Sequence, residues 1–144
     1  MKWIGGLNTA KTAYFALMES HIRYALAVWG GTSEKKILQK RAIRILADLN
    51  FKDSCREAFR TLGIMTVVGL YIQSVIQFAD GEKFPRVEEI HSYTTRQANI
   101  YYLPSHRTTQ LEKKPSYMGR RLCNALPKYM RSLIGEELKK ALHK

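Results

Sequence analysis

The sequence has few cysteines and no long apolar run. Its two cysteines, Cys55 and Cys123, stand in a chain of 144 residues. This number excludes a disulfide-dense secreted scaffold and a zinc site built on paired cysteines. No stretch reaches the ~18 apolar residues of a membrane span, and the first residues lack the apolar segment of a secretory signal. We therefore expect an intracellular protein, in the nucleus or cytoplasm, with no membrane partner.

Acidic residues are half as numerous as basic ones. Asp and Glu total 12 against 24 Lys and Arg, which gives a net charge of +12. Such an excess favours a polyanionic partner such as nucleic acid. Phosphoryl transfer by two metal ions requires clustered carboxylates. The aspartates Asp48, Asp53 and Asp80 are dispersed, as are the histidines. We expect no catalytic residue, no metal site and no cofactor.

Helix start and stop signals divide the first half of the chain. They predict four helices: from Asn8-Thr9 to Trp29, ended by Gly30-Gly31; about 34–48; a short helix opened by a capping box at 54–57 and ended by Gly63; and 67–79, opened by Thr66 and ended by Asp80-Gly81. In the first of these helices, apolar positions recur at three- and four-residue steps. They predict a buried stripe that includes His21: Tyr14, Leu17, His21, Ala25, Val28 and Trp29. The segment 67–79 is apolar on nearly every side, which is typical of a buried helix.

The composition changes after Pro85. Residues 86–117 show no sustained period, and Pro104 and Pro115 are expected to interrupt any helix there. We predict an extended arm with one short strand at Asn99–Leu103. Pro127 suits the first turn of a helical segment, and the order of acid and base after it favours a helix at the tail. The expected fold is mainly α: a small helical bundle, then an irregular extended arm and short C-terminal helices.

The segment SEKKILQKRAIRIL, residues 33–46, carries the most informative charge pattern. At the helical period, four cations fall within a sector of about 140°: Lys36, Lys40, Arg41 and Arg44. Leu38, Ala42, Ile45 and Leu46 fall on the opposite side. One face would then dock on a core while the other meets backbone phosphates. The alternative is a merely solvated face. A membrane-surface helix is disfavoured because the apolar side lacks large aromatics.

The chain resembles the C-terminal region of non-LTR, jockey-like retrotransposon reverse transcriptases, downstream of the polymerase palm. Five blocks carry the resemblance, in the family's order: AYFALMESHIRYALAVWGG at 13–31, ILQKRAIRIL at 37–46, DSCREAFRTLGIMTVVGLYI at 53–72, HSYTTRQANIYYLPSHRT at 91–108 and YMGRRLCNALPKYMR at 117–131. The connection from Trp29-Gly30 to Leu38 looks shorter than the family's. The palm, with its aspartate pair, and the family's endonuclease have no counterpart here.

The resemblance implies a thumb-like helical bundle at 1–82 and a C-terminal extension at 83–144. A reverse transcriptase thumb grips the primer–template duplex through backbone contacts, so little sequence specificity is expected. The implied function is that of a palm-lacking fragment, not an enzyme by itself, which binds RNA–DNA or DNA duplex weakly. An intact reverse transcriptase or a second copy are further partners left open.

The expected nucleic-acid-binding residues are the four cations of 33–46 and a weaker set of arginines: Lys36, Lys40, Arg41, Arg44, Arg96, Arg107, Arg120 and Arg121. Each arginine of the weaker set is equally compatible with a solvated or structural role. The competing hypothesis is an inert or protein-interaction module.

Overall fold

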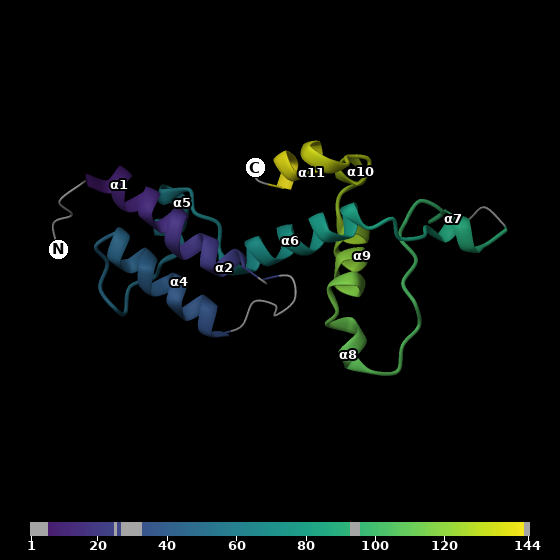
Figure 1. The fold of residues 1–144 in the computed structure, drawn as a ribbon, viewed down its shortest axis with the longest axis horizontal. Helices are drawn as coiled ribbons and strands as arrows, with labels where there is room; N and C mark the ends of the chain where they lie inside the picture. The colour runs from purple at the N-terminus through teal and green to yellow at the C-terminus, as the bar shows by residue number, and fades with distance from the viewer. Residues whose placement is uncertain (1–5, 25, 27–32, 93–95, 143–144) are drawn as a thin grey trace. The chain divides into compact units, whose positions relative to one another are not determined.

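A computed structural model describes residues 6–24, 26, 33–92 and 96–142, with the side chain of Ser33 left out. The predicted mainly α fold is confirmed, and the described residues form no strand, only one antiparallel bridge between Arg86 and Tyr101. Figure 1 shows the order of the helices. Their bounds are α1 Gly6–Ala13, the π-helix η1 Tyr14–Glu19, α2 Ser20–Arg23, α4 Ser33–Leu46, α5 Arg56–Leu62, α6 Val67–Gly81, α7 Val87–Ile90, α8 Thr109–Glu112, α9 Pro115–Ala125, α10 Lys128–Arg131 and α11 Gly135–Leu142.

The chain divides into two units, Met1–Tyr71 and Ile72–Lys144, called unit 1 and unit 2 below. The division falls inside α6, whereas the sequence analysis placed it after residue 82. The reason lies in the packing of α6, because its two halves belong to different cores. Val67 and Leu70 pack with Ile22 and Leu26 in unit 1. Ile76 and Ala79 pack with Cys123 and Leu138 in unit 2.

The first helical segment of unit 1 contains a π-helix, which the sequence analysis missed. A π-turn takes one residue more than an α-turn, so the inward positions shift along the chain. The residues that face the core therefore follow at steps of four: Tyr14, Met18, Ile22 and Leu26. The predicted stripe is wrong after Tyr14, because Leu17 is 74% exposed and His21 is also exposed. Ala25, Val28, Trp29 and the Gly30-Gly31 stop lie outside the described residues.

Local signals placed the next helices well. α4 ends at Leu46, two residues before its predicted end, and Asp48 then adopts a left-handed φ of 51°. α5 ends at Gly63, whose φ of 62° is a conformation that glycine adopts readily. The predicted capping box at 54–57 does not form, because the N-cap residue is Cys55, whose side chain makes no capping bond, and Ser54 Oγ accepts from Arg56 N at 3.4 Å. Thr66 caps α6, accepting a hydrogen bond from Gly69 N at 3.2 Å.

The apolar helix α6 is only partly buried. Leu70 and Val75 are fully covered, but Val68, Ile72 and Phe78 are 36–46% exposed. The prediction that α6 is buried on nearly all sides is therefore wrong for one part of its circumference. No single described helix is long and apolar enough to span a membrane. The pair α5 and α6 together has the length and composition of a membrane span, but the two helices are bent by 58° relative to each other.

Unit 2 contains more helix than the sequence analysis expected. Residues 86–117 include the short helices α7 and α8, and the predicted strand at Asn99–Leu103 is reduced to the single bridge at Tyr101. Pro115 does not interrupt a helix but begins one, α9, because the first helical residue needs no N–H donor. The predicted helices after Pro127 and at the tail are present as α10 and α11.

The helices α9 and α6 approach each other closely at Gly119. A Cβ built there would lie 2.7 Å from the Val75 carbonyl oxygen and 2.7 Å from the Ala79 Cβ. A larger residue would not fit at position 119 unless its neighbours moved. Glycine is therefore favoured here by the close packing and not by its φ, which lies outside the left-handed region. This contact brings Cys123 of α9 into the same cluster as Ala79 and Ile76 of α6.

Candidate nucleic-acid interface

The helix α4 packs along α1 and η1 (Figure 1). The side of α4 that faces away from them carries cations. The buried side of α4 is formed by Gln39, Ile43 and Leu46. Lys36, Lys40 and Arg41 are exposed. No described carboxylate lies within ion-pair distance of Lys36, Lys40, Arg41 or Arg44. Three of the four predicted cations are therefore solvated and free of acidic partners in the part of the chain that is described.

The buried side of α4 differs from the predicted one. Leu46 is buried and Ala42 half-buried, but Leu38 is 45% and Ile45 55% exposed. Relative to the predicted apolar side, the buried side is rotated by about 80° towards Gln39. The hydropathy pattern predicted the wrong buried side because Gln39, the residue at the centre of the observed buried side, is polar. The cations therefore share the exposed surface of α4 with three apolar side chains, Ile37, Leu38 and Ile45.

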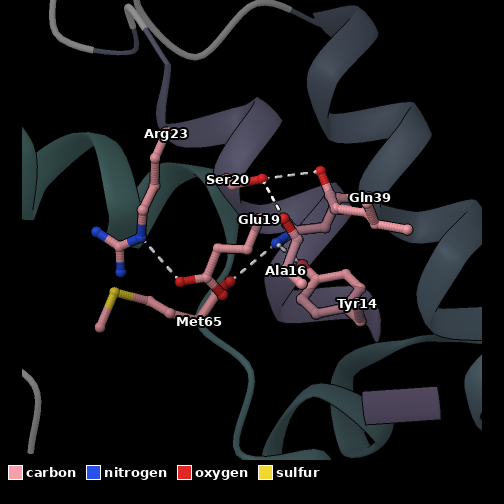
Figure 2. Close-up of polar contacts among 8 residues, drawn as sticks. Tyr14, Ala16, Glu19, Ser20, Arg23, Gln39 and Met65 are labelled. Carbon is pink, nitrogen blue, oxygen red and sulfur yellow. Dashed lines mark hydrogen bonds and ion pairs between the residues drawn. The ribbon is translucent and has the colours of Figure 1, made fainter. Parts of the chain in front are cut away.

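Gln39 explains this rotation (Figure 2). Its side chain is 2% exposed and donates from Nε2 to the Tyr14 hydroxyl and the Met65 carbonyl, each at 2.9 Å. Its Oε1 accepts from Val67 N at 2.8 Å. One amide thereby connects η1, α4 and the start of α6, and a buried amide with all these partners is well satisfied. Burial raises the pKa of Tyr14, and the hydrogen bond from Gln39 opposes that rise only in part.

Arg44 differs from the other three cations. Its Nη2 donates to the Asp53 carbonyl at 3.3 Å, and its guanidinium carbon lies 5.6 Å from the centre of the Phe51 ring. Its Nε is buried and makes no hydrogen bond with a described residue. Arg44 therefore joins α4 to the following loop, and only part of its charge is presented to solvent.

The loop after α4 is tied to the helix at several points. A turn spans Asn50–Asp53, in which Asp53 N donates to Asn50 O at 3.1 Å and Asn50 N donates to Asp53 Oδ2 at 2.8 Å. Cys55 Sγ lies 3.7 Å from Lys40 O. At the tip of this turn Phe51 is 77% exposed, and Lys52 beside it is exposed too. Phe51 was not predicted from the sequence as part of this surface.

The second predicted set lies in unit 2 and is not uniform. Arg96, Arg107 and Arg121 are exposed. Arg120 is half-buried: it donates to Ser116 O at 2.9 Å and to Tyr102 O at 3.0 Å, and it lies 4.7 Å from the Phe84 ring centre. Arg120 therefore has the structural role that the sequence analysis left open for it. This second set belongs to a different unit from the α4 cations.

Carbonyl-bound arginines recur in unit 2. Arg86 Nη1 donates to Asn99 O and Arg131 Nε to Leu126 O, each at 2.6 Å. Asn124 adds a pair of bonds to the backbone of Tyr101, at 2.8 and 2.9 Å. The arm that the sequence analysis predicted is therefore fastened to α9 along Tyr101 and Tyr102. Charge in this unit stabilises backbone that has no helical partner.

Two aspartates and one histidine among the described residues have clear structural contacts. Asp53 holds the turn after α4, and Asp80 Oδ2 accepts from Gly135 N at 2.7 Å at the start of α11. His106 Nε2 lies 3.0 Å from Glu112 Oε1, and its ring meets Tyr117 edge-on. Among the described residues, no three His, Cys, Asp or Glu side chains are grouped as metal ligands would be.

Unit 2 also contains a small, partly open pocket of about 30 Å³, lined by residues that include Asp80, Tyr101 and Cys123. Its volume suits a single water molecule rather than a substrate. Burial raises the pKa of the Cys123 thiol to about 11, and the Asp80 carboxylate adds to the effect. A thiol with so high a pKa is a poor nucleophile at neutral pH.

The chain has no match among family models, curated proteins or solved structures.

Proposed function

We propose that this chain is a nucleic-acid-binding module that corresponds to the region after the palm of a retrotransposon reverse transcriptase. Its exposed α4 cations would contact the phosphates of a primer–template duplex, either RNA–DNA or DNA. The assignment to that family depends on the five sequence blocks described above. The assignment of the surface depends on α4.

The observation that carries the binding proposal is the state of the α4 cations. Lys36, Lys40 and Arg41 are exposed and have no described acidic partner. An acid beside them would compete with phosphate, and burial would oppose contact. The net charge of the chain, +12, adds a general attraction to polyanions. Contacts to phosphate carry no direct sequence information, so the binding should be non-specific.

We propose binding and not polymerisation for this chain by itself. Two of its three aspartates are occupied in local structure, Asp53 in the turn after α4 and Asp80 at the start of α11. Among the described residues, neither belongs to a group of three or more His, Cys, Asp or Glu side chains, as the chemistry of two metal ions would require. Extension of a labelled primer by the purified protein with Mg²⁺ would contradict this part of the proposal.

The direct test is a salt titration of binding to an RNA–DNA duplex. Neutralisation of three or four phosphates predicts a slope of about −3 to −4 for the logarithm of affinity against the logarithm of salt concentration. Replacement of all four α4 cations by glutamine should abolish most of this slope: Lys36→Gln, Lys40→Gln, Arg41→Gln and Arg44→Gln.

A matched control removes the same number of charges from exposed positions of unit 2: Lys113→Gln, Lys114→Gln, Lys128→Gln and Lys140→Gln. If net charge alone drives binding, the two variants will lose affinity equally. If α4 is the contact surface, the control will keep a slope close to that of the original chain. Unchanged binding by the α4 variant would reject this helix as the interface.

A second candidate is a protein-interaction module without affinity for nucleic acid. The exposed apolar side chains of unit 1 favour it, because Leu17, Leu38 and Ile45 are 45–74% exposed. Apolar surface left in water promotes association. This candidate predicts self-association that grows with protein concentration, measured by light scattering, together with no duplex binding at low salt.

A further inference from the structure

The exposed aromatic ring of Phe51 is the feature of unit 1 that phosphate binding leaves unexplained. Phe51 is 77% exposed at the tip of the Asn50–Asp53 turn. Single apolar side chains on a surface are common. This one differs because it stands against a cation of the α4 row, with the Arg44 guanidinium carbon 5.6 Å from its ring centre.

We infer that Phe51 is a stacking platform for an unpaired base of a bound nucleic acid, beside the phosphate contacts of α4. The inference rests on the proposed function. Proteins that hold single strands combine cations, which follow the backbone, with aromatic rings on which bases stack. Phe51 and the exposed Lys40, Arg41 and Lys52 supply both elements in one unit.

The turn holds the ring outside the core. Asp53 is bonded to Asn50 through both its backbone N–H and its carboxylate, and its carbonyl accepts from Arg44. Leu49 N donates to Arg44 O at 2.9 Å. The apolar cluster of this region takes in Leu46, Leu49 and Cys55 but not Phe51. Inward movement of the ring would break these bonds, so the backbone that carries the ring is held in place before binding, which lowers the entropic cost of binding.

Arg44 leaves one side of the platform available. The guanidinium lies over the ring, yet 77% of Phe51 remains exposed. A base stacked on the open side would complete a layered arrangement of cation, ring and base. Bases inside a duplex are already stacked on their neighbours and cannot use the ring. The platform therefore favours single strands and the unpaired overhang of a primer–template junction over continuous duplex.

The test compares two probes with the same phosphates. One is a labelled oligothymidylate of about 20 nucleotides, and the other is an abasic oligomer of the same length. Stacking of one base should make the oligothymidylate bind about tenfold more tightly to the original chain, by fluorescence anisotropy at low salt. Phe51→Leu keeps an apolar side chain without a π-face and should reduce the ratio to about one. Phe51→Trp should retain or increase it.

Tyr129 of unit 2 provides the matched control, since it is 72% exposed and aromatic but lies on α10. Tyr129→Leu should leave the tenfold ratio unchanged. Far-UV circular dichroism should be the same for all variants, because the substituted side chains are exposed.

Each failure has a separate signature. Equal binding of both probes by the original chain, with the salt slope retained, overturns the platform and leaves the proposed function standing. A ratio that survives Phe51→Leu, or is lost in Tyr129→Leu, also overturns it. Absence of binding to either probe overturns the platform, and the proposed function is overturned as well only if the RNA–DNA duplex also fails to bind. If vesicles of phosphatidylserine and phosphatidylcholine bind in a manner that depends on Phe51 while the two probes bind equally, the ring serves a membrane surface and the platform is overturned.

Discussion

The two units use charge in opposite ways. In unit 1 a neutral amide, Gln39, joins the helices from inside. Three of the four α4 cations, Lys36, Lys40 and Arg41, remain in solvent, and only Arg44 of these four donates to a carbonyl of a described residue. In unit 2 the arginines Arg86, Arg120 and Arg131 donate to backbone carbonyls. The difference shows that the net charge of +12 does not measure what is available to a partner. An arginine bound to a carbonyl contributes to stability, and its geometry is no longer free to follow a phosphate backbone.

The largest expected effect is that of Gln39→Leu in unit 1. The substitution leaves the Tyr14 hydroxyl, the Met65 carbonyl and the buried Val67 N–H without their amide partner. Each unsatisfied buried group costs about 1–3 kcal/mol, so the free energy of unfolding should fall by about 3–5 kcal/mol. Urea unfolding followed by circular dichroism measures it. Tyr14→Phe, which removes one of the bonds, should cost about 1 kcal/mol. A Gln39→Leu variant as stable as the original chain would show that unit 1 is not held by this amide.

Next in size is the loss of Arg120 from unit 2. Arg120→Ala removes two hydrogen bonds to carbonyls and the stacking on Phe84, and should destabilise by about 2–3 kcal/mol. The adjacent exposed Arg121 is a control of identical charge, and Arg121→Ala should change stability by less than about 0.5 kcal/mol. Duplex binding of Arg120→Ala, measured well below its unfolding midpoint, should match that of the control. The comparison between the units fails if Arg120→Ala is as stable as Arg121→Ala.

Close helix packing gives a smaller contrast between the units. Gly119→Ala places a Cβ 2.7 Å from the Val75 carbonyl oxygen, and backbone has to move. We expect a loss of about 1–2 kcal/mol, after the better helix propensity of alanine is included. In Gly69→Ala the Cβ meets the flexible side chain of Met65, 2.7 Å from its Cγ, which can change rotamer. This variant should be at least as stable as the original chain in thermal unfolding.

The smallest effect is an alkaline loss of stability that belongs to unit 2. Burial raises the pKa of Cys123 from 9.0 to about 11. The unfolded chain therefore releases this proton first, and the stabilisation is complete below pH 9 and disappears as the pH rises through 11. By pH 10 the loss is about 1 kcal/mol. Cys123→Ala should flatten the decline of unfolding free energy between pH 9 and 10. An equally steep decline in that variant would assign it to other groups.

Sequence signals were reliable where a local residue decides the conformation. Gly63 and Thr66 fixed the end of α5 and the start of α6, because a left-handed glycine and a capping hydroxyl act within one turn. Pro115 was misinterpreted because proline interrupts a helix and also begins one, and which of the two applies depends on the residues that follow.

The candidate site was predicted only where local sequence pattern decides it. The exposure of Lys36, Lys40 and Arg41 follows from the helical period alone. The partners of Gln39 and Arg120 could not be predicted, because they join residues 18–28 positions apart. Phe51 was missed because its exposure depends on a turn closed by Asp53, and hydropathy assigns phenylalanine to a core.

The π-helix at Tyr14–Glu19 accommodates one more residue than a regular helix of the same length. Shortening the chain by one residue within this segment would convert it to an ordinary α-helix, and Ala10 before it and Ile22 after it would keep their present neighbours. The same deletion within α4 would turn every later side chain by about 100° and bring Lys40 or Arg44 towards the interior. Among the described helices, tolerance to a change of length is therefore concentrated in the segment whose hydrogen bonds already span an additional residue.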